Sequence, residues 1–152
     1  MEKITKFLCI DFGEKRVGIA VTDENKKYSF SREFIKNDIN FFNNLLKIIG
    51  EEFISKIILG YPLNMKSEKT QQTLKVEEFR NKLEERLKNH SPEIEIIFFD
   101  ERFTSSIAES YIRESPLKRT SRQNKGLVDS ASAQIILQDY IDKQILVQQT
   151  TI

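Results

Sequence analysis

The chain has 152 residues, 39% of them hydrophobic and 31% charged, which is the composition of one globular domain with its own core. Lysine and arginine total 24 against 23 aspartate and glutamate residues, so a net charge of +1 gives no argument for a nucleic-acid partner from bulk charge. The single cysteine, Cys9, excludes an internal disulfide and a zinc cluster, and no apolar run approaches the roughly 18 residues of a membrane span. We expect a single domain over residues 1–152 in a soluble, cytoplasmic protein without a membrane partner.

The first part of the chain predicts an antiparallel meander. Residues 7–11 and 16–22 are typical of strands, and the short segment between them contains Gly13, which suits a hairpin turn. In residues 26–35, "KKYSFSREFI", apolar and polar residues alternate, which predicts a third and more exposed strand.

From Asn37 onward the apolar residues recur at helical spacing, and Asn37 or Asp38 is available as the N-cap. The segment 56–62, "KIILGYP", then predicts a short buried strand stopped by Gly60 and Pro62. A long helix is predicted over 67–89. The apolar stripe of the first helix consists of Ile39, Phe42, Leu46, Ile49 and Phe53. The stripe of the second helix consists of Val76, Phe79, Leu83 and Leu87.

A fifth strand over 93–103, "EIEIIFFDERF", carries two adjacent acids, and 104–113 predicts a short helix. We expect a mobile basic loop over 116–125, a last helix over 124–144 and a disordered tail over 146–152. The order of elements predicts a mixed five-stranded α/β sheet with helices on both faces. In such sheets the chemistry gathers at the carboxyl ends of the parallel strands.

Acidic residues from three separate segments of the chain fall at that edge, and each segment has a structural alternative. Asp11 ends the first strand, although a turn also accounts for it. Asp100 and Glu101 end the fifth strand, where their side chains point to opposite faces and only one reaches a site shared with Asp11. Asp129 begins the last helix beside small residues, where an acid also suits the helix dipole.

Taken together, these acids indicate a metal site. Carboxylate oxygens suit Mg²⁺ or Mn²⁺ rather than zinc. A pair of such ions can activate water and stabilise the leaving oxygen in phosphodiester hydrolysis, so the pattern predicts a metal-dependent nuclease with a two-metal-ion mechanism.

A basic segment supplies candidate contacts to a phosphate backbone. Residues 113–125 hold five basic residues against Glu114 alone, a local net of +4 (five minus one). A solvated charged face is the structural alternative. The candidate nucleic-acid contacts are Lys15, Arg16, Arg102, Arg113, Lys118, Arg119, Arg122 and Lys125.

Four motifs resemble the YqgF/RuvX family of ribonuclease-H-like nucleases, in family order and over nearly the whole chain. They are "IDFGEKRVGIAV" at 10–21, "ILGYPLNM" at 58–65, "FDERFTSSIAE" at 99–109 and "NKGLVDSASAQIIL" at 124–137. The resemblance implies a ribonuclease-H-like fold with strand order 3-2-1-4-5 and the second strand antiparallel. It also implies catalytic, metal-binding acids at Asp11, Asp129 and Glu101, with Asp100 as the substitute for Glu101.

The same resemblance implies a nuclease. We favour maturation of the 5′ end of the pre-16S ribosomal RNA as its function, and the alternative is a Holliday junction resolvase acting in DNA recombination and repair. The related resolvase RuvC takes its second acid from the fourth strand, whereas that strand ends here as "ILGYP" without a carboxylate. The two functions imply different partners, an RNA precursor or a four-way DNA junction, and the protein binds its partner as a monomer or a homodimer.

Two hypotheses from other classes stand beside these. A phosphotransferase of the actin and sugar-kinase type opens on a similar Asp-x-Gly hairpin but needs a second domain, for which 152 residues leave no room. A non-catalytic nucleic-acid or ribosome-associated binding module on the same fold predicts that Asp11→Asn leaves function intact.

Overall fold

The computed structural model describes the backbone of residues 3–101 and 125–150 and the side chains of 3–101 and 131–148. Its sheet has the strand order β3-β2-β1-β4-β5, as predicted. The β1–β2 and β2–β3 pairs are antiparallel, and the β1–β4 and β4–β5 pairs are parallel. The elements are β1 (Lys6–Asp11), β2 (Arg16–Thr22), β3 (Ser29–Lys36), α1 (Phe41–Glu52), β4 (Ile54–Tyr61), α2 (Gln71–His90), β5 (Glu95–Asp100) and α5 (Lys125–Thr150).

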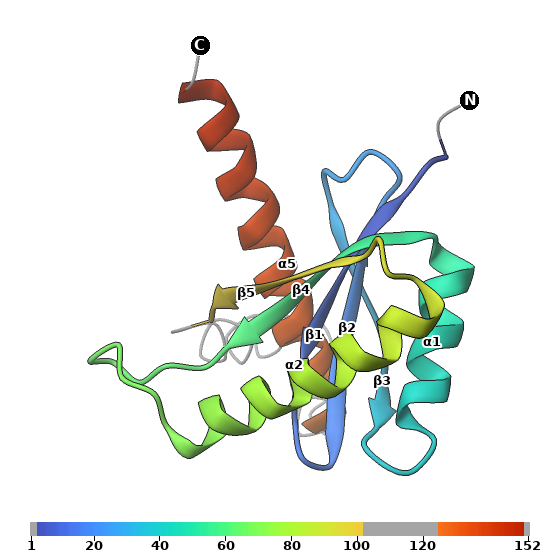
Figure 1. The fold of residues 1–152 in the computed structure, drawn as a ribbon. Helices are drawn as coiled ribbons and strands as arrows, with labels where there is room; N and C mark the ends of the chain where they lie inside the picture. The colour runs from blue at the N-terminus through green and yellow to red at the C-terminus, as the bar shows by residue number, and fades with distance from the viewer. Residues whose placement is uncertain (1–2, 102–124, 151–152) are drawn as a thin grey trace.

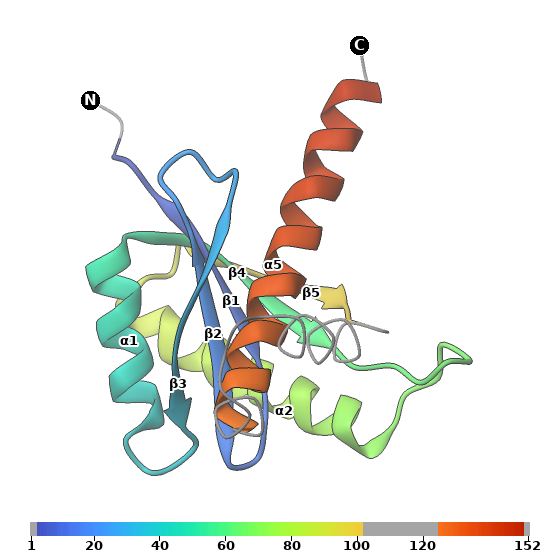
Figure 2. The same cartoon turned by 180° about the vertical axis from the view of Figure 1, so that it is seen from behind.

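Helices cover both faces of this sheet (Figures 1 and 2). Helices α1 and α2 pack on one face, over a core that includes Leu8 and Ile10 of β1. Helix α5 packs on the other face, over a second core that includes Cys9. The central strand β1 is therefore buried on both sides, because successive side chains of a strand point to opposite faces.

The turn between β1 and β2 depends on Gly13. A Cβ built on Gly13 would collide with the carbonyl oxygen of Arg16, so a side chain there would force the hairpin open. The side-chain amide of Asn37 donates to the carbonyl oxygen of Gly13 at 2.9 Å, which ties the turn to the end of β3. The turn after Asp11 is thus held in place from two sides.

Helix α1 begins later than the sequence pattern indicates. Its N-cap is Asn40 rather than Asn37 or Asp38. The Asp38 carboxylate accepts from the amide of Asn40 at 2.9 Å, and this turn separates β3 from the helix. Ile39 consequently lies outside the helix and is 96% exposed. The buried face of α1 is formed by Phe41, Leu45 and Ile49.

The stripe predicted for α2 is confirmed, because Val76, Phe79, Leu83 and Leu87 are all buried. The helix begins four residues later than position 67, after the N-cap Thr70. The hydroxyl of Thr70 accepts from the amide of Thr73, and the Thr73 hydroxyl accepts from the amide of Thr70.

Helix α5 runs to Thr150, so the tail expected from residue 146 is helical over most of its length. The helix predicted over 104–113 and the loop residues 116–124 lie outside the described residues, while Lys125 begins α5. No helix in the described part of the chain is long and apolar enough to cross a membrane.

Candidate active site

Two carboxyl groups from different strand ends meet at one edge of the sheet. Asp11 is the last residue of β1 and Glu101 directly follows β5, while β4 lies between those two strands. The side chains of Glu101 and Asp11 share a hydrogen bond. This bond holds the two side chains against each other at the sheet edge. The structure thus brings together two of the three acids that the sequence indicates.

Glu101 reaches Asp11 by crossing β4 at Gly60. The backbone amide of Glu101 donates to the carbonyl oxygen of Tyr61 at 3.4 Å, which continues the β4–β5 pairing by one residue. A Cβ built on Gly60 would lie 2.5 Å from a carboxylate oxygen of Glu101. Two strand spacings, roughly 10 Å, separate β5 from β1, so the carboxylate needs a path across the intervening strand.

Sequence reasoning assigned Gly60 only to the end of a strand and missed this role. The usable signal is a glycine that follows a run of buried residues from Ile57 to Leu59, because such a glycine marks a close approach by another group. The structure identifies the group as a carboxylate from the neighbouring strand.

Alternation along β5 determines which of the two adjacent acids lies near Asp11. Phe99 makes a ring contact with Tyr140 of α5, with centroids 5.8 Å apart, so its side chain faces α5. Glu101, two residues later, continues that face. Asp100 has the opposite parity and is exposed. The geometry therefore pairs Glu101, and not Asp100, with Asp11.

The electrostatics of the pair reflect its burial. Burial raises the pKa of Glu101 above its ordinary value, the hydrogen bond with Asp11 acts in the opposite direction, and the charge of Asp100 raises the pKa further. Cys9 lies two residues before Asp11 on the same strand face and is fully buried. Burial raises the pKa of its thiol well above the ordinary value, and the charges of Asp11 and Glu101 add to this effect. Cys9 therefore contributes a neutral core group.

The third predicted acid, Asp129, lies in the first turns of α5. Positions 129, 133 and 136 share one side of a helix, because they are separated by four and three residues. Ala133 and Ile136 pack against the sheet, so position 129 is on the sheet-facing side of α5. The side chain of Asp129 is outside the described residues, and its role stays a prediction.

The predicted basic contacts are described only in part. Lys15 is exposed in the turn after Asp11, and the Arg16 guanidinium lies 5.9 Å from the ring centroid of Phe34. Lys125 belongs to the first turn of α5, with its side chain outside the described residues. The structure does not describe Arg102, Arg113, Lys118, Arg119 or Arg122.

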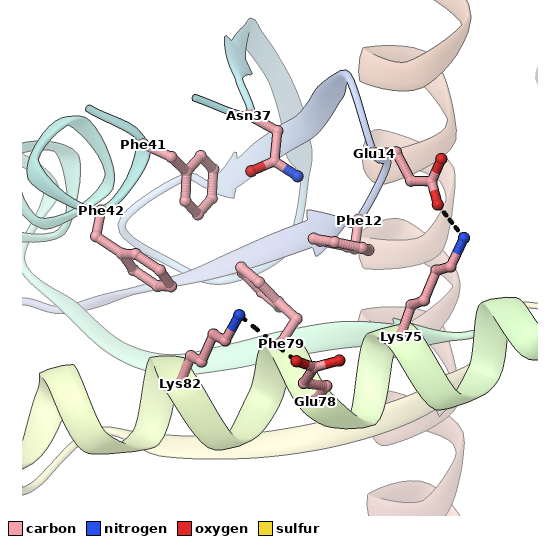
Figure 3. Close-up of a pocket in the computed structure, with 9 residues that line it drawn as sticks. All are labelled: Phe12, Glu14, Asn37, Phe41, Phe42, Lys75, Glu78, Phe79 and Lys82. Carbon is pink, nitrogen blue, oxygen red and sulfur yellow. Dashed lines mark hydrogen bonds and ion pairs between the residues drawn. The ribbon is translucent and has the colours of Figure 1, made fainter. Parts of the chain in front are cut away.

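An aromatic hollow of about 260 Å³ lies beside the turn that follows Asp11, between that turn, α1 and α2 (Figure 3). Phe12 packs against Phe79 of α2 with ring centroids 4.7 Å apart, and Phe42 of α1 stacks on Phe79 at 5.9 Å. These contacts anchor the residue next to Asp11 to both helices, which restrains the end of β1.

The charges around this hollow neutralise one another. Lys75 pairs with Glu14 from the turn, and Lys82 pairs with Glu78 at 3.6 Å along α2 (Figure 3). Because both lysines already have carboxylate partners, the hollow carries no excess positive charge for a phosphate group.

The donor set around Asp11 fits a hard divalent cation. The two carboxyl groups supply oxygen ligands side by side, and a bound cation would oppose their negative charge. Among the side chains that the structure describes, no three His, Cys, Asp or Glu residues form a group suited to a metal ion. Asp129, whose side chain is outside the described residues, stays the predicted third ligand.

Comparison with solved structures shows the same fold. The fowlpox virus resolvase in complex with Holliday junction DNA aligns with a TM-score of 0.59 at 12% identity, covering 92% of this chain and 99% of that one. The RuvC of T. thermophilus in complex with a Holliday junction substrate aligns with a TM-score of 0.58 at 10% identity, covering 93% and 96%. The fold is therefore that of ribonuclease-H-like resolvases, as predicted.

Sequence comparison identifies the family. A protein of Sulfurihydrogenibium sp. is 42% identical over 92% of this chain and 92% of its own length, and one of Flavobacterium psychrophilum is 39% identical over 92% and 98%. Both carry the name "Putative pre-16S rRNA nuclease". The family model described as "RuvX: Holliday junction resolvase" matches residues 5–143. The resemblance seen in the four motifs is thus confirmed, and this chain belongs to the RuvX family.

Proposed function

We propose that this protein is a metal-dependent endonuclease that hydrolyses phosphodiester bonds in the precursor of 16S ribosomal RNA, at its 5′ end. The observation that carries the proposal is the pair of carboxyl groups of Asp11 and Glu101, which meet across Gly60 at the carboxyl edge of the parallel strands. The names of relatives at 39–42% identity support this choice of reaction and substrate.

Asp11 and Glu101 would hold one or two Mg²⁺ or Mn²⁺ ions, together with Asp129 from α5. When bound, the ion supplies positive charge that favours ionisation of water and opposes the negative charge developing on the phosphodiester. Burial of Glu101 and its hydrogen bond with Asp11 fix the direction of both carboxylates before a substrate arrives. Lys15 in the turn after Asp11 and Arg16 at the start of β2 would bind the phosphate backbone near the cut.

The decisive experiment incubates the purified protein and Mn²⁺ with a labelled 16S precursor RNA and, separately, with a labelled four-way DNA junction. We expect cleavage of the precursor and its loss in Asp11→Asn and Asp129→Asn. Because a catalytic metal contributes several kcal/mol, the expected loss is about 100-fold or more. Cleavage that survives both substitutions contradicts the proposal and favours the non-catalytic binding module.

Junction resolution is the second candidate, and the aligned resolvase structures favour it. The two substrates predict different assemblies, because a resolvase that cuts two symmetric strands acts as a two-fold dimer. Exclusive cleavage of the four-way junction, together with a dimeric mass by light scattering, would replace ribosomal RNA maturation by resolution.

A further inference from the structure

A second pocket, of about 380 Å³, lies at the opposite end of the sheet from Asp11 and Glu101. It is formed between the start of β1, the turn that joins β2 to β3, β4 and the second half of α5. Figure 2 shows α5 running from the β1–β2 turn to well beyond the start of β1, past the β2–β3 turn. The pocket and the carboxyl pair are therefore on the same, α5-covered side of the sheet.

The pocket is lined by three lysines, Lys26, Lys27 and Lys56, and none of its lining residues is acidic. Lys56 donates to the hydroxyl of Tyr140 at 3.1 Å. The Nζ atoms of Lys56 and Lys26 lie 5.0 Å and 5.3 Å from the ring centroid of Phe7. Aromatic groups thus hold two ammonium groups at the pocket wall.

These lysines differ from those of the aromatic hollow on the other face. Within residues 3–101 and 131–148, neither Lys26 nor Lys56 forms an ion pair with a carboxylate. Lys75 and Lys82 of the hollow are both paired. The pocket therefore retains positive charge that the rest of the described surface does not cancel by direct contact.

The β2–β3 turn is built in a way that preserves this charge. Lys26 has φ of 57°, in the left-handed region where glycine or asparagine is favoured. In this turn the Asp23 carboxylate accepts from the backbone amides of Lys27 at 2.9 Å and Tyr28 at 3.1 Å, and the charge of Lys27 also lowers the pKa of Asp23. Glu24 is exposed in the same turn and does not line the pocket.

We propose that this pocket binds the phosphate backbone of the nucleic-acid substrate at a distance from the cut, an inference that rests on the proposed function. Phe7 and Asp11 share one face of β1 and are four residues apart, which is about 13 Å along the strand. For a duplex that lies along β1, with a rise of roughly 3 Å per base pair, the pocket would contact the backbone about four base pairs from the carboxyl pair. The lysines supply affinity, and the spacing sets how much flanking duplex the enzyme needs.

The test measures the salt dependence of RNA affinity by fluorescence anisotropy, with the full chain in EDTA and a labelled RNA duplex of about 20 base pairs. Two double variants are compared. The first combines Lys26→Gln with Lys56→Gln, and the second combines Lys26→Gln with Lys27→Gln. The second double leaves the bond between Lys56 and Tyr140 intact, so it stays informative if the first one unfolds. The matched control is Lys75→Gln, Lys82→Gln, which removes two paired lysines from the other face.

The slope of log affinity against log salt is negative. We expect each double variant of the pocket to make it shallower by about 1.5, because each lost phosphate contact contributes roughly 0.7–0.9 to its magnitude. The control should change the slope by less than half of that. Equal slopes in wild type and in both double variants of the pocket would show that the pocket does not bind the phosphate backbone. The proposed nuclease function would not be affected by that result. A wild-type chain that binds neither RNA nor four-way DNA junctions overturns the proposed function itself.

A second measurement tests the spacing. Single-turnover cleavage is compared on a substrate with long flanking duplex and on one trimmed to about two base pairs from the cut. The pocket doubles should be slower than wild type on the long substrate and equal to it on the trimmed one. An equal defect on both substrates overturns the proposed position of the backbone.

Discussion

A carboxylate oxygen of Glu101 lies 2.5 Å from the point where a Cβ on Gly60 would be. This contact joins two strands, because Gly60 belongs to β4 and Glu101 follows β5. The glycine is needed for the close approach of the carboxylate and not for an unusual backbone angle, since no described glycine has positive φ. A site built on Asp11 and Glu101 therefore depends on a residue that has no functional group.

Gly60→Ala should displace Glu101 and weaken the site while the fold persists. We expect Mn²⁺ affinity and nuclease activity to fall by about tenfold or more, as for other residues that orient metal ligands. Isothermal titration with Mn²⁺ measures the affinity, and circular dichroism verifies the fold.

The matched control for this variant is Gly50→Ala in α1, where a new Cβ meets nothing within 4 Å. It should leave Mn²⁺ binding unchanged and stabilise the protein by about 0.5–1 kcal/mol, because alanine is favoured over glycine inside a helix. Equal Mn²⁺ affinities in the two variants would show that the contact at Gly60 does not position Glu101.

Glu101→Gln and Asp100→Asn separate the two adjacent acids. Glu101→Gln should remove a metal ligand and reduce cleavage by about 100-fold. Asp100→Asn, on the opposite strand face, should reduce cleavage by less than about threefold, since it acts on Glu101 only through its charge. The larger loss in Asp100→Asn would transfer the ligand role to that residue.

The raised pKa of Glu101 predicts how metal-free stability depends on pH. A carboxyl group with a raised pKa in the folded state contributes stability below its unfolded pKa and loses that contribution as the pH rises through the folded value. In EDTA, wild type should therefore lose stability relative to Glu101→Gln as the pH rises above about 4. Urea unfolding at each pH measures the difference, and parallel curves would contradict the shift.

Adding Mn²⁺ near neutral pH should make wild type more stable than Glu101→Gln. The ion binds only the folded site, so it should raise the unfolding midpoint of wild type more than that of Glu101→Gln. An equal rise in both proteins would mean that Glu101 is not a ligand.

Leu83→Ala in α2 should destabilise the protein by about 2–5 kcal/mol, because Leu83 is fully buried in the core beneath α1 and α2. Leu74→Ala, in the same helix, removes a side chain that is 57% exposed and should change the stability by less than about 0.5 kcal/mol. Urea unfolding of the two variants measures both values, and similar losses would contradict the assignment of the buried face.

The sequence by itself determined the strands, the strand order through its family resemblance, and the buried stripe of α2. These follow from local periodicity, which shows which residues share a face. Local periodicity also put Phe7, Cys9 and Asp11 on one side of β1, where the structure has the second pocket and the carboxyl pair. It failed at the start of α1, because the turn at Asp38 overrides the apolar spacing.

Only the tertiary structure decided how the separate pieces meet. The sequence pattern indicates Gly60 only as the end of a strand, because its role depends on β4 lying between β1 and β5. The lysine pocket likewise draws Lys26 and Lys56 onto Phe7 from turns and strands far apart in the chain. Spacing along a sequence carries no record of such contacts, since they arise from strand order and from the path of α5 across the sheet.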